Sequence, residues 1–361
     1  MHKITRVGVD LAKNVIQVHA VDASGIKVAN KALKRDQFIN WCTQQLPAGC
    51  MIVIVGTSGA HHWGRQLRQL GFDVRLIAAH LASPFRMAGK HGKNDANDAA
   101  AVREAAARPQ MRFIPIKSTD QQAKLAVHSF RELLKKDRTA AINQIRAALT
   151  EFGVVIPKDP DSLRVQLHDL IEDGSNEMTG IARILLQHTY LHWIAIEEKR
   201  TWCEQQINIH LAQDDKARKA ASLMGVGHIT ALGTVATVVD FHQFKNGAQL
   251  GAWIGLTPKQ HSSGGTAKLG SISKHGNAYL RSLLIQGAKS VVFTAHRRTD
   301  SLSKWVLQLK LRVGWQKAAV ALANRNPQIL WAIMTKDIDY DPNYKSQKPA
   351  GKNLATSNAT A

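Results

Sequence analysis

The sequence RVGVDLAKNVIQVHAVDASGIKV, residues 6–28, decides the fold of the first part of the chain. Apolar residues dominate Arg6–Asp10 and Val15–Val21, and a turn sequence at residues 22–25 precedes the short apolar segment Ile26–Val28. Short apolar segments bounded by turn residues are typical of strands. We therefore expect three consecutive strands in an antiparallel meander.

Helical and strand patterns alternate after this meander. Met51–Val55 is a continuous apolar run, which is typical of a strand buried on both faces, and Phe72–Ile77 predicts another strand. Helical patterns occupy residues 35–46, 61–70 and 94–107. This order predicts an α/β domain over residues 1–117 with the element order of a ribonuclease-H-like fold.

The remaining chain is predicted to be helical. Residues 118–217 contain two long helical patterns with apolar stripes, which predict a hairpin. Because a hairpin that projects from a domain must bury its apolar stripe, we favour a coiled coil that dimerises. A simple helical spacer is the alternative. Residues 218–336 form a third, mostly helical region, and the polar segment 337–361 is expected to be a disordered tail.

Charge and composition narrow the class of protein. The 361 residues include 48 Lys+Arg and 27 Asp+Glu, a formal net charge of +21, which favours nucleic acid as partner over a merely basic surface. Three cysteines without a Cys-x-x-Cys pair exclude a zinc ribbon and a disulfide framework. We find neither an apolar run of roughly 18 residues, the length of a membrane span, nor a signal-peptide pattern, so we expect a cytoplasmic protein.

Three aspartates form the first candidate site. Asp10 ends the first predicted strand, at the sheet edge where ligands bind in open α/β sheets. Asp95 and Asp98 are three residues apart at a helix start and share one face. Together they predict a site for Mg²⁺, a cation that activates nucleophiles and neutralises phosphate charge. The alternative is that acids at a helix start only complement the helix dipole.

Two glycines indicate a helix–hairpin–helix. Gly225 and Gly227 lie between two helical patterns, so that backbone N–H groups can approach a phosphate at the start of the second helix. Such a motif binds the DNA backbone without reading sequence. An ordinary tight helical turn is the alternative at equal weight.

A loop containing serine and glycine is the third candidate. Ser262 and Ser263 precede two glycines, and Lys268, Lys274 and Arg281 follow. A serine hydroxyl becomes a nucleophile when its surroundings activate it, and these cations could stabilise a pentavalent phosphate. The residues alone favour a loop that binds phosphate without acting as a nucleophile. Further basic residues, among them Lys135 and Arg138, follow one side of the first long helix and are candidates for nucleic-acid binding.

These motifs together resemble the DEDD transposases of RNA-guided bacterial insertion sequences, the bridge-RNA or seekRNA class, which are relatives of the Piv DNA invertases. The resemblance covers about residues 5–335. It is carried by VGVDLAKN at 7–14, SGAHHW at 58–63, KNDANDA at 93–99, GLTPKQHSSGG at 255–265 and KHGNAYLR at 274–281.

The resemblance implies a RuvC-like domain with Asp, Glu, Asp and Asp around Mg²⁺, a dimerising helical arm, and a C-terminal domain with a nucleophilic serine. Asp10, Asp95 and Asp98 match three of the acids, and Ser263 matches the serine, with Ser262 as fallback. The family's Glu corresponds to Val55.

The implied reaction is strand exchange between donor and target DNA in the bacterial nucleoid through a covalent phosphoserine link. A non-coding guide RNA pairs with both DNAs, and homodimers join into a tetramer. Because Val55 is not acidic, a nucleic-acid-binding relic that does not cut is the second hypothesis. A RuvC-like nuclease or junction resolvase is the third.

Overall fold

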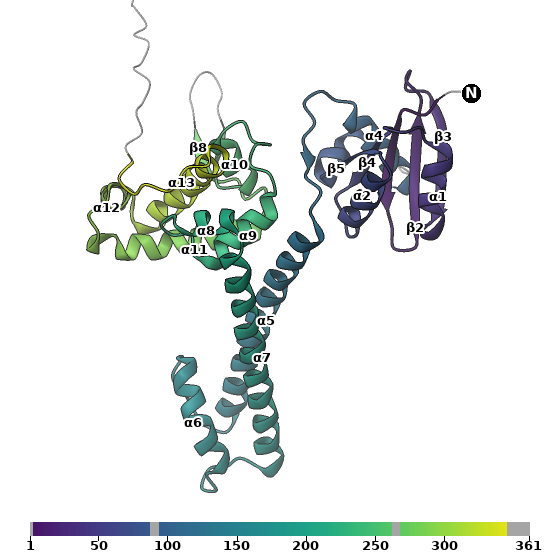
Figure 1. Ribbon diagram of the computed structural model, residues 1–361. Coiled ribbons are helices and arrows are strands. Elements are labelled where there is room, and N and C mark those ends of the chain that lie inside the picture. The colour runs from purple at the N-terminus through teal and green to yellow at the C-terminus, as the bar shows by residue number, and fades with distance from the viewer. Residues whose placement is uncertain (1–2, 87–93, 262–267, 345–361) are drawn as a thin grey trace, which may run out of the picture. The chain divides into compact units, whose positions relative to one another are not determined.

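The computed structural model describes residues 3–86, 94–261 and 268–344. The chain divides into two compact units, residues 1–122 with 238–240 and residues 123–237 with 241–361. Figure 1 shows a sheet with helices in the first unit and helices almost throughout the second. The expected mixed α/β class, with a sheet near the N-terminus and a helical remainder, is confirmed.

The first unit contains one sheet with the strand order β3-β2-β1-β4-β5-β6. β1 pairs antiparallel with β2 and parallel with β4, and β5 continues the parallel part. The strands are β1 (Arg6–Leu11), β2 (Val15–Val21), β3 (Lys27–Lys34), β4 (Met51–Val55), β5 (Asp73–Ile77) and β6 (Phe113–Ile114). The antiparallel meander and the order of the following strands agree with the sequence patterns.

Helices cover both faces of this sheet. On one face, Phe38 of α1 (Arg35–Gln45) and Leu67 of α2 (Ala60–Gln69) pack in a cluster with Val9 of β1. On the other face, Val102 of α4 (Asp95–Ala106) packs against Val53 of β4. Because strand side chains alternate between faces, neighbouring residues of β1 serve different layers.

The second unit begins with a helical hairpin. α5 (Thr119–Glu151) and α7 (Gly180–Ala212) pack against each other and against α6 (Pro160–Glu172) through a shared apolar cluster. Figure 1 shows α5 and α7 side by side along the hairpin. The predicted pair of long helices is therefore present.

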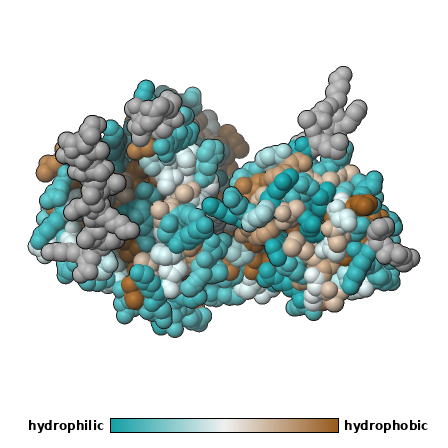
Figure 2. All heavy atoms as spheres, turned by 90° about the horizontal axis from the view of Figure 1, so that it is seen from above, coloured by the Kyte–Doolittle hydropathy of each residue, from teal (hydrophilic) through white to brown (hydrophobic). Residues whose placement is uncertain are grey.

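The remaining helices of the second unit form a body around α11 and α13, which contact each other extensively. Figure 2 shows mostly hydrophilic side chains on the visible face of the molecule, with apolar side chains in small separate patches. None of the helices within the described ranges is long and apolar enough to cross a bilayer. The elements are α8 (Asp215–Ala221), α9 (His228–Val238), α10 (Gly247–Ile254), β7 (Pro258–Gln260), β8 (Leu269–Ile272), α11 (Ala278–Thr294), η2 (Ala295–Arg297), α12 (Ser301–Val313) and α13 (Trp315–Lys336).

The structure adds details that the sequence patterns did not predict. β3 continues to Lys34, well beyond the expected segment, and β6, α3 (Ala79–Ala82) and η1 (Ser83–Phe85) were not expected. Of the expected tail, residues 345–361 lie outside the described residues. Asp337, the first residue of the expected tail, accepts a hydrogen bond from Lys219 at 2.6 Å.

Candidate active site

Gly8 determines how closely α4 approaches the sheet. A Cβ atom at Gly8 would lie 2.1 Å from the carbonyl oxygen of Ala99 and 2.7 Å from the backbone nitrogen of Arg103. Only a residue without a side chain allows this contact between β1 and α4. Asp10 lies two residues further along the same face of β1, so the first turns of α4 lie near its carboxylate.

The start of α4 presents two carboxylates. Asn94 caps the helix, since its side chain accepts a hydrogen bond of 2.8 Å from the backbone nitrogen of Asn97. Asp95 and Asp98 are in the first turn, where the helix dipole favours negative charge. Asparagine at this position fixes where the helix begins and therefore where both aspartates lie.

The charges of Asp95 and Asp98 act on the carboxyl group of Asp10. Burial raises the pKa of Asp10, and the negative charges of Asp98 and Asp95 raise that pKa further. A backbone hydrogen bond at Leu11 and the positive charge of Arg86 act in the opposite direction. A bound cation would offset the repulsion that Asp98 and Asp95 exert on Asp10.

Arg86, the last described residue before the gap at 87–93, brings a positive charge to this cluster. Its Nε donates a hydrogen bond to Oδ1 of Asp98, and both side chains are largely shielded from solvent. The sequence patterns did not identify Arg86, because its position depends on the short helix η1 that precedes it. Among the described residues, no group of three or more His, Cys, Asp or Glu side chains is arranged to hold a metal ion.

Val55 lies beside Asp10. Val9 and Ile54 are the last partners in the β1–β4 register, so Asp10 and Val55 follow at adjoining strand ends. The Val55 side chain is 6% exposed and packs with Val102 of α4. An apolar side chain therefore fills this position, on the same face of the sheet as Asp10.

The glycine hairpin between α8 and α9 has one packed and one open glycine. Gly225 has a φ of +82°, and its carbonyl oxygen would lie 1.9 Å from a Cβ at Gly287 of α11. Asn326 donates a hydrogen bond of 3.3 Å to the carbonyl of Met224. Gly227 has no neighbour within 4 Å of a Cβ built there. Gly225 thus fixes the hairpin against α11, and Gly227 leaves its backbone accessible.

The serine loop lies largely outside the described residues, which include neither Ser262 nor Ser263. On either side of the gap, the backbone nitrogen of His261 donates to the carbonyl of Lys268 at 2.9 Å. β7 and β8 pair next to this contact. The structure therefore describes the base of a hairpin that carries the serine segment.

The predicted basic residues have different surroundings. Arg281 donates to the carbonyl of Ile254 at 3.0 Å, at the end of α10. Arg138 bonds to Glu197 of α7, and the side chain of Lys135 is 62% exposed. Lys268 and Lys274 are exposed, and Lys274 adopts a φ of +58°.

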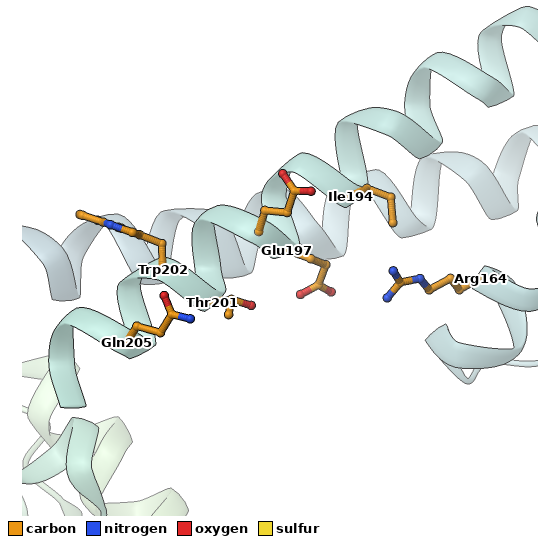
Figure 3. Close-up of a pocket in the computed structure, with 7 residues that line it drawn as sticks. Arg164, Ile194, Glu197, Thr201, Trp202 and Gln205 are labelled. Atoms are coloured by element: carbon orange, nitrogen blue, oxygen red, sulfur yellow. The ribbon is translucent and has the colours of Figure 1, made fainter. Parts of the chain in front are cut away.

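A hollow of about 390 Å³ lies between α6 and α7. Figure 3 shows Arg164 of α6 extending toward the part of α7 that carries Glu197 and Thr201, with Trp202 further along the helix. This hollow is remote in sequence from the aspartates, and it mixes charged and apolar side chains.

Comparison with known proteins identifies the family. A model described as Transposase IS116/IS110/IS902 family matches residues 217–303, and a second, described as Transposase and representing the DEDD type of IS110, matches residues 7–154. The chain is 38% identical to a "Probable family 20 transposase" of Pseudomonas aeruginosa, over 94% of this chain and 99% of that protein. The chain belongs to the IS116/IS110/IS902 transposase family.

Two further relatives carry names of insertion-sequence transposases. The "Transposase for insertion sequence element IS1111A" of Coxiella burnetii is 36% identical over 94% of this chain and 92% of the relative. The "Transposase for insertion sequence element IS1328" of Yersinia enterocolitica is 32% identical over 93% of this chain and 98% of the relative. The transposase is therefore an insertion-sequence enzyme of the IS110 family whose partner is DNA.

Proposed function

We propose that this transposase exchanges strands between donor and target DNA under the guidance of a non-coding RNA, with Ser263 as nucleophile and Ser262 as fallback. Mg²⁺ would be held by Asp10, Asp95 and Asp98. The observation that carries the proposal is the close contact of Gly8 with α4, because it brings these carboxylates from two elements to one sheet edge.

The donor chemistry fits a hard divalent cation, since carboxylate oxygens are its preferred ligands and the three aspartates repel one another without it. When bound, such a cation supplies charge neutralisation at a scissile phosphate. In the proposed step Ser263 Oγ forms a bond to phosphorus while the bond to the displaced DNA oxygen breaks. The serine proton leaves to solvent, and the displaced oxygen takes up a proton.

The nucleic-acid contacts of the proposal use residues outside this cluster. Gly227 has an accessible backbone at the start of α9, where N–H groups suit phosphate. Lys268, Lys274 and Lys135 are exposed and suit phosphate as well. Base pairing of the guide RNA would read the sequence, whereas the protein would recognise backbone and shape.

The ribonuclease-H-like assignment is supported by the order β3-β2-β1-β4-β5, with three antiparallel strands followed by parallel ones. We keep the division into a catalytic domain (1–117), a helical arm (118–217), a C-terminal domain (218–336) and a tail (337–361) as part of the proposal. This division separates the carboxylates from the serine in sequence.

A homodimer would form through α7, as the first step to a tetramer on DNA. One side of this helix packs in the hairpin, and its other side carries exposed apolar side chains, which are 48–76% exposed. Apolar side chains on one side of a helix suit a second copy of that helix. The stripe consists of Ile181, Ile184, Leu185, Leu191, Trp202 and Ile209.

The dimer is tested by light scattering on the purified chain. Leu185→Lys should halve the mass of the parent dimer, because it introduces a charge into the stripe. Val155→Lys is the matched control, since Val155 is 82% exposed but lies in the α5–α6 connection. An unchanged mass for Leu185→Lys would exclude this interface.

Val55 favours one rival function, a nucleic-acid-binding relic that does not cut. The cluster has no carboxylate at this position, and a missing anionic ligand weakens metal binding. The relic would bind guide RNA and DNA ends but give no Mg²⁺-dependent strand break in the parent protein. Val55→Glu would then increase recombination, and robust cleavage by the parent would eliminate this rival.

The deciding experiment is recombination in vitro with insertion-sequence ends, guide RNA and Mg²⁺. Ser263→Ala should abolish both recombination and the covalent protein–DNA adduct while nucleic-acid binding remains, and Ser262→Ala tests the fallback nucleophile in the same assay. If Ser263→Ala recombines as fast as the parent, the proposed serine is wrong. Hydrolysed ends without any adduct would support the RuvC-like nuclease instead.

A further inference from the structure

Two aromatic side chains lie together on the surface where α11 ends and α13 begins. Phe293 is 54% exposed and Trp315 is 36% exposed. Their ring centroids are 5.2 Å apart, and the planes are inclined by 40°. This separation is that of a contacting aromatic pair. The pair therefore forms one ordered apolar surface that remains open to solvent.

Two other tryptophans of this body have partners within the protein. Trp331 donates its ring N–H to the carbonyl of Phe244 at 3.0 Å. Trp305 lies under the guanidinium of Arg325, at 4.5 Å from the ring centroid. In the described part of the chain, the ring nitrogen of Trp315 makes no such hydrogen bond. Packing of the body thus explains these two tryptophans better than it explains Trp315.

The charged residues along α11, α12 and α13 are almost entirely positive. Residues 278–336 contain ten Lys and Arg and a single acid, Asp300. The Asp300 carboxylate already accepts hydrogen bonds from Ser303 and from Arg298. No carboxylate of this segment is therefore available to neutralise the cations near the aromatic pair.

Cations flank both rings along the chain. Lys289 lies four residues before Phe293 on α11, which puts both on one side of that helix, and Arg297 follows Phe293 at the end of η2. Arg312 and Lys317 are exposed close to Trp315. Within the described ranges, none of these four side chains forms an ion pair with a carboxylate. Their charges are available to a ligand that carries negative groups at regular intervals.

We propose that Phe293 and Trp315 form a stacking platform for an unpaired base of a polynucleotide, whose phosphates bind Lys289, Arg297, Arg312 and Lys317. Aromatic faces flanked by cations are the chemistry of single-strand recognition. A second copy of this surface is disfavoured, because it would oppose like charges. The inference rests on the proposed function only in that nucleic acid is the partner.

The test is fluorescence anisotropy with the full chain and three labelled probes of twenty nucleotides: oligouridine, oligothymidine and a DNA duplex. Trp315→Leu keeps an apolar side chain but removes the aromatic face. Because stacking contributes about 1–3 kcal/mol per base, this change should weaken single-strand binding about 5- to 150-fold. Trp315→Phe should restore most of that affinity, and duplex binding should change less than about twofold.

The control is Leu311→Ala, since Leu311 is 89% exposed, apolar and close in sequence but not aromatic. It should leave all affinities unchanged. Lys317→Gln should lower the slope of log affinity against log salt by about 0.7 for the single strands. Thermal melting verifies folding, and Phe293→Leu gives an independent second variant with the same expected loss. Loss on oligouridine alone identifies RNA, and loss on both single strands identifies any unpaired strand.

Unchanged single-strand affinity in folded Trp315→Leu overturns the platform, as does an equal loss on the duplex. A lower oligomer mass with unchanged affinity also overturns it and assigns the surface to a protein contact. These outcomes are separate from the proposed chemistry, which Ser263→Ala tests through recombination. If the parent itself binds none of the probes, the inference and the nucleic-acid part of the proposed function fail together.

Discussion

Gly8→Ala should move α4, with Asp95 and Asp98, away from β1 and its Asp10. The added Cβ would lie 2.1 Å from the Ala99 carbonyl oxygen, whereas ordinary van der Waals contact begins near 3.4 Å, so α4 must retreat by about the difference, 1.3 Å. Both atoms that the Cβ meets first belong to backbone, which cannot rotate away. Overpacking of this kind costs about 1–3 kcal/mol, and we expect the upper end.

Hydrogen exchange measures this cost at the helix itself. A loss of about 3 kcal/mol corresponds to exchange that is about 150-fold faster for the amides of α4 in the Ala99–Arg103 region. The retreat also moves Asp95 and Asp98 away from Asp10, and a displacement of about 1 Å can reduce a catalysed rate about 100-fold. Mg²⁺-dependent DNA cleavage should therefore fall by about that factor.

Gly174→Ala is the matched control, because a Cβ there has no neighbour within 4 Å and its backbone has no positive φ. It should leave exchange in α4 and cleavage unchanged. If Gly8→Ala shows parental exchange in α4, then α4 does not depend on this contact with β1. The argument for how the carboxylates come together would then be wrong.

Three further changes test the charges of the chain. Asp10→Asn should stabilise the cation-free protein at neutral pH, because burial and the neighbouring acids raise the pKa of Asp10 in the folded state. The ionised Asp10 carboxylate destabilises the fold fully above that folded-state pKa and not at all below the unfolded value near 4. Thermal melts of the parent and the variant across this pH range check the prediction. Arg86→Gln should lower the melting temperature in EDTA, because it removes the bond to Asp98. The same change should increase the affinity for Mn²⁺ measured by calorimetry, because Arg86 and the cation compete for Asp98. Weaker Mn²⁺ binding by the variant would contradict this competition. Arg138→Gln should lower the free energy of unfolding in urea by about 1 kcal/mol, because it removes the bond to Glu197. Lys135→Gln, at an exposed position, should reduce nucleic-acid affinity and leave the unfolding free energy unchanged. Equal effects of the two variants on stability and on affinity would refute the different roles of Arg138 and Lys135.

The pH dependence of the hairpin follows from the same bond. Burial alone would raise the pKa of Glu197, but hydrogen bonds from Arg138, Arg200 and Trp193 outweigh it and lower that pKa. The stabilisation is therefore present above the unfolded value near 4.3 and is lost as pH falls through the lower folded value. The Arg138→Gln penalty should accordingly disappear in acid.

The sequence predicted the order of the main strands along the chain, because these strands are apolar and bounded by turns. β6 could not be predicted, since it has only two residues and exists through the pairing of Phe113 with Ile77. The outer part of β3 was missed because its residues are mostly exposed and lack an apolar pattern. Local periodicity therefore finds the buried strands and overlooks edges that depend on distant partners.

The candidate site was predictable to the same extent. The spacing of Asp95 and Asp98 on a helix start was visible, and so was the lack of an acid at position 55. Gly8 was a missed signal: a glycine between two buried valines weakens a strand unless another backbone approaches closely. Arg86 gave no signal, because its contact arises only from the turn that follows β5.

Val55 and Arg86 together change the charge balance of the cluster. Three aspartates and one arginine carry a formal charge of −2, which a single divalent cation neutralises. A glutamate in place of Val55 would make the balance −3, and displacement of Arg86 from Asp98 would then leave enough negative charge for two cations. In the proposed metal site, the buried valine and the bound arginine would therefore both favour one cation rather than two. A site with one cation can still polarise a phosphate, but it does not hold both the attacking and the leaving oxygen as a two-metal site does. Under the proposed mechanism, cationic side chains rather than a second metal ion would then have to stabilise the second oxygen.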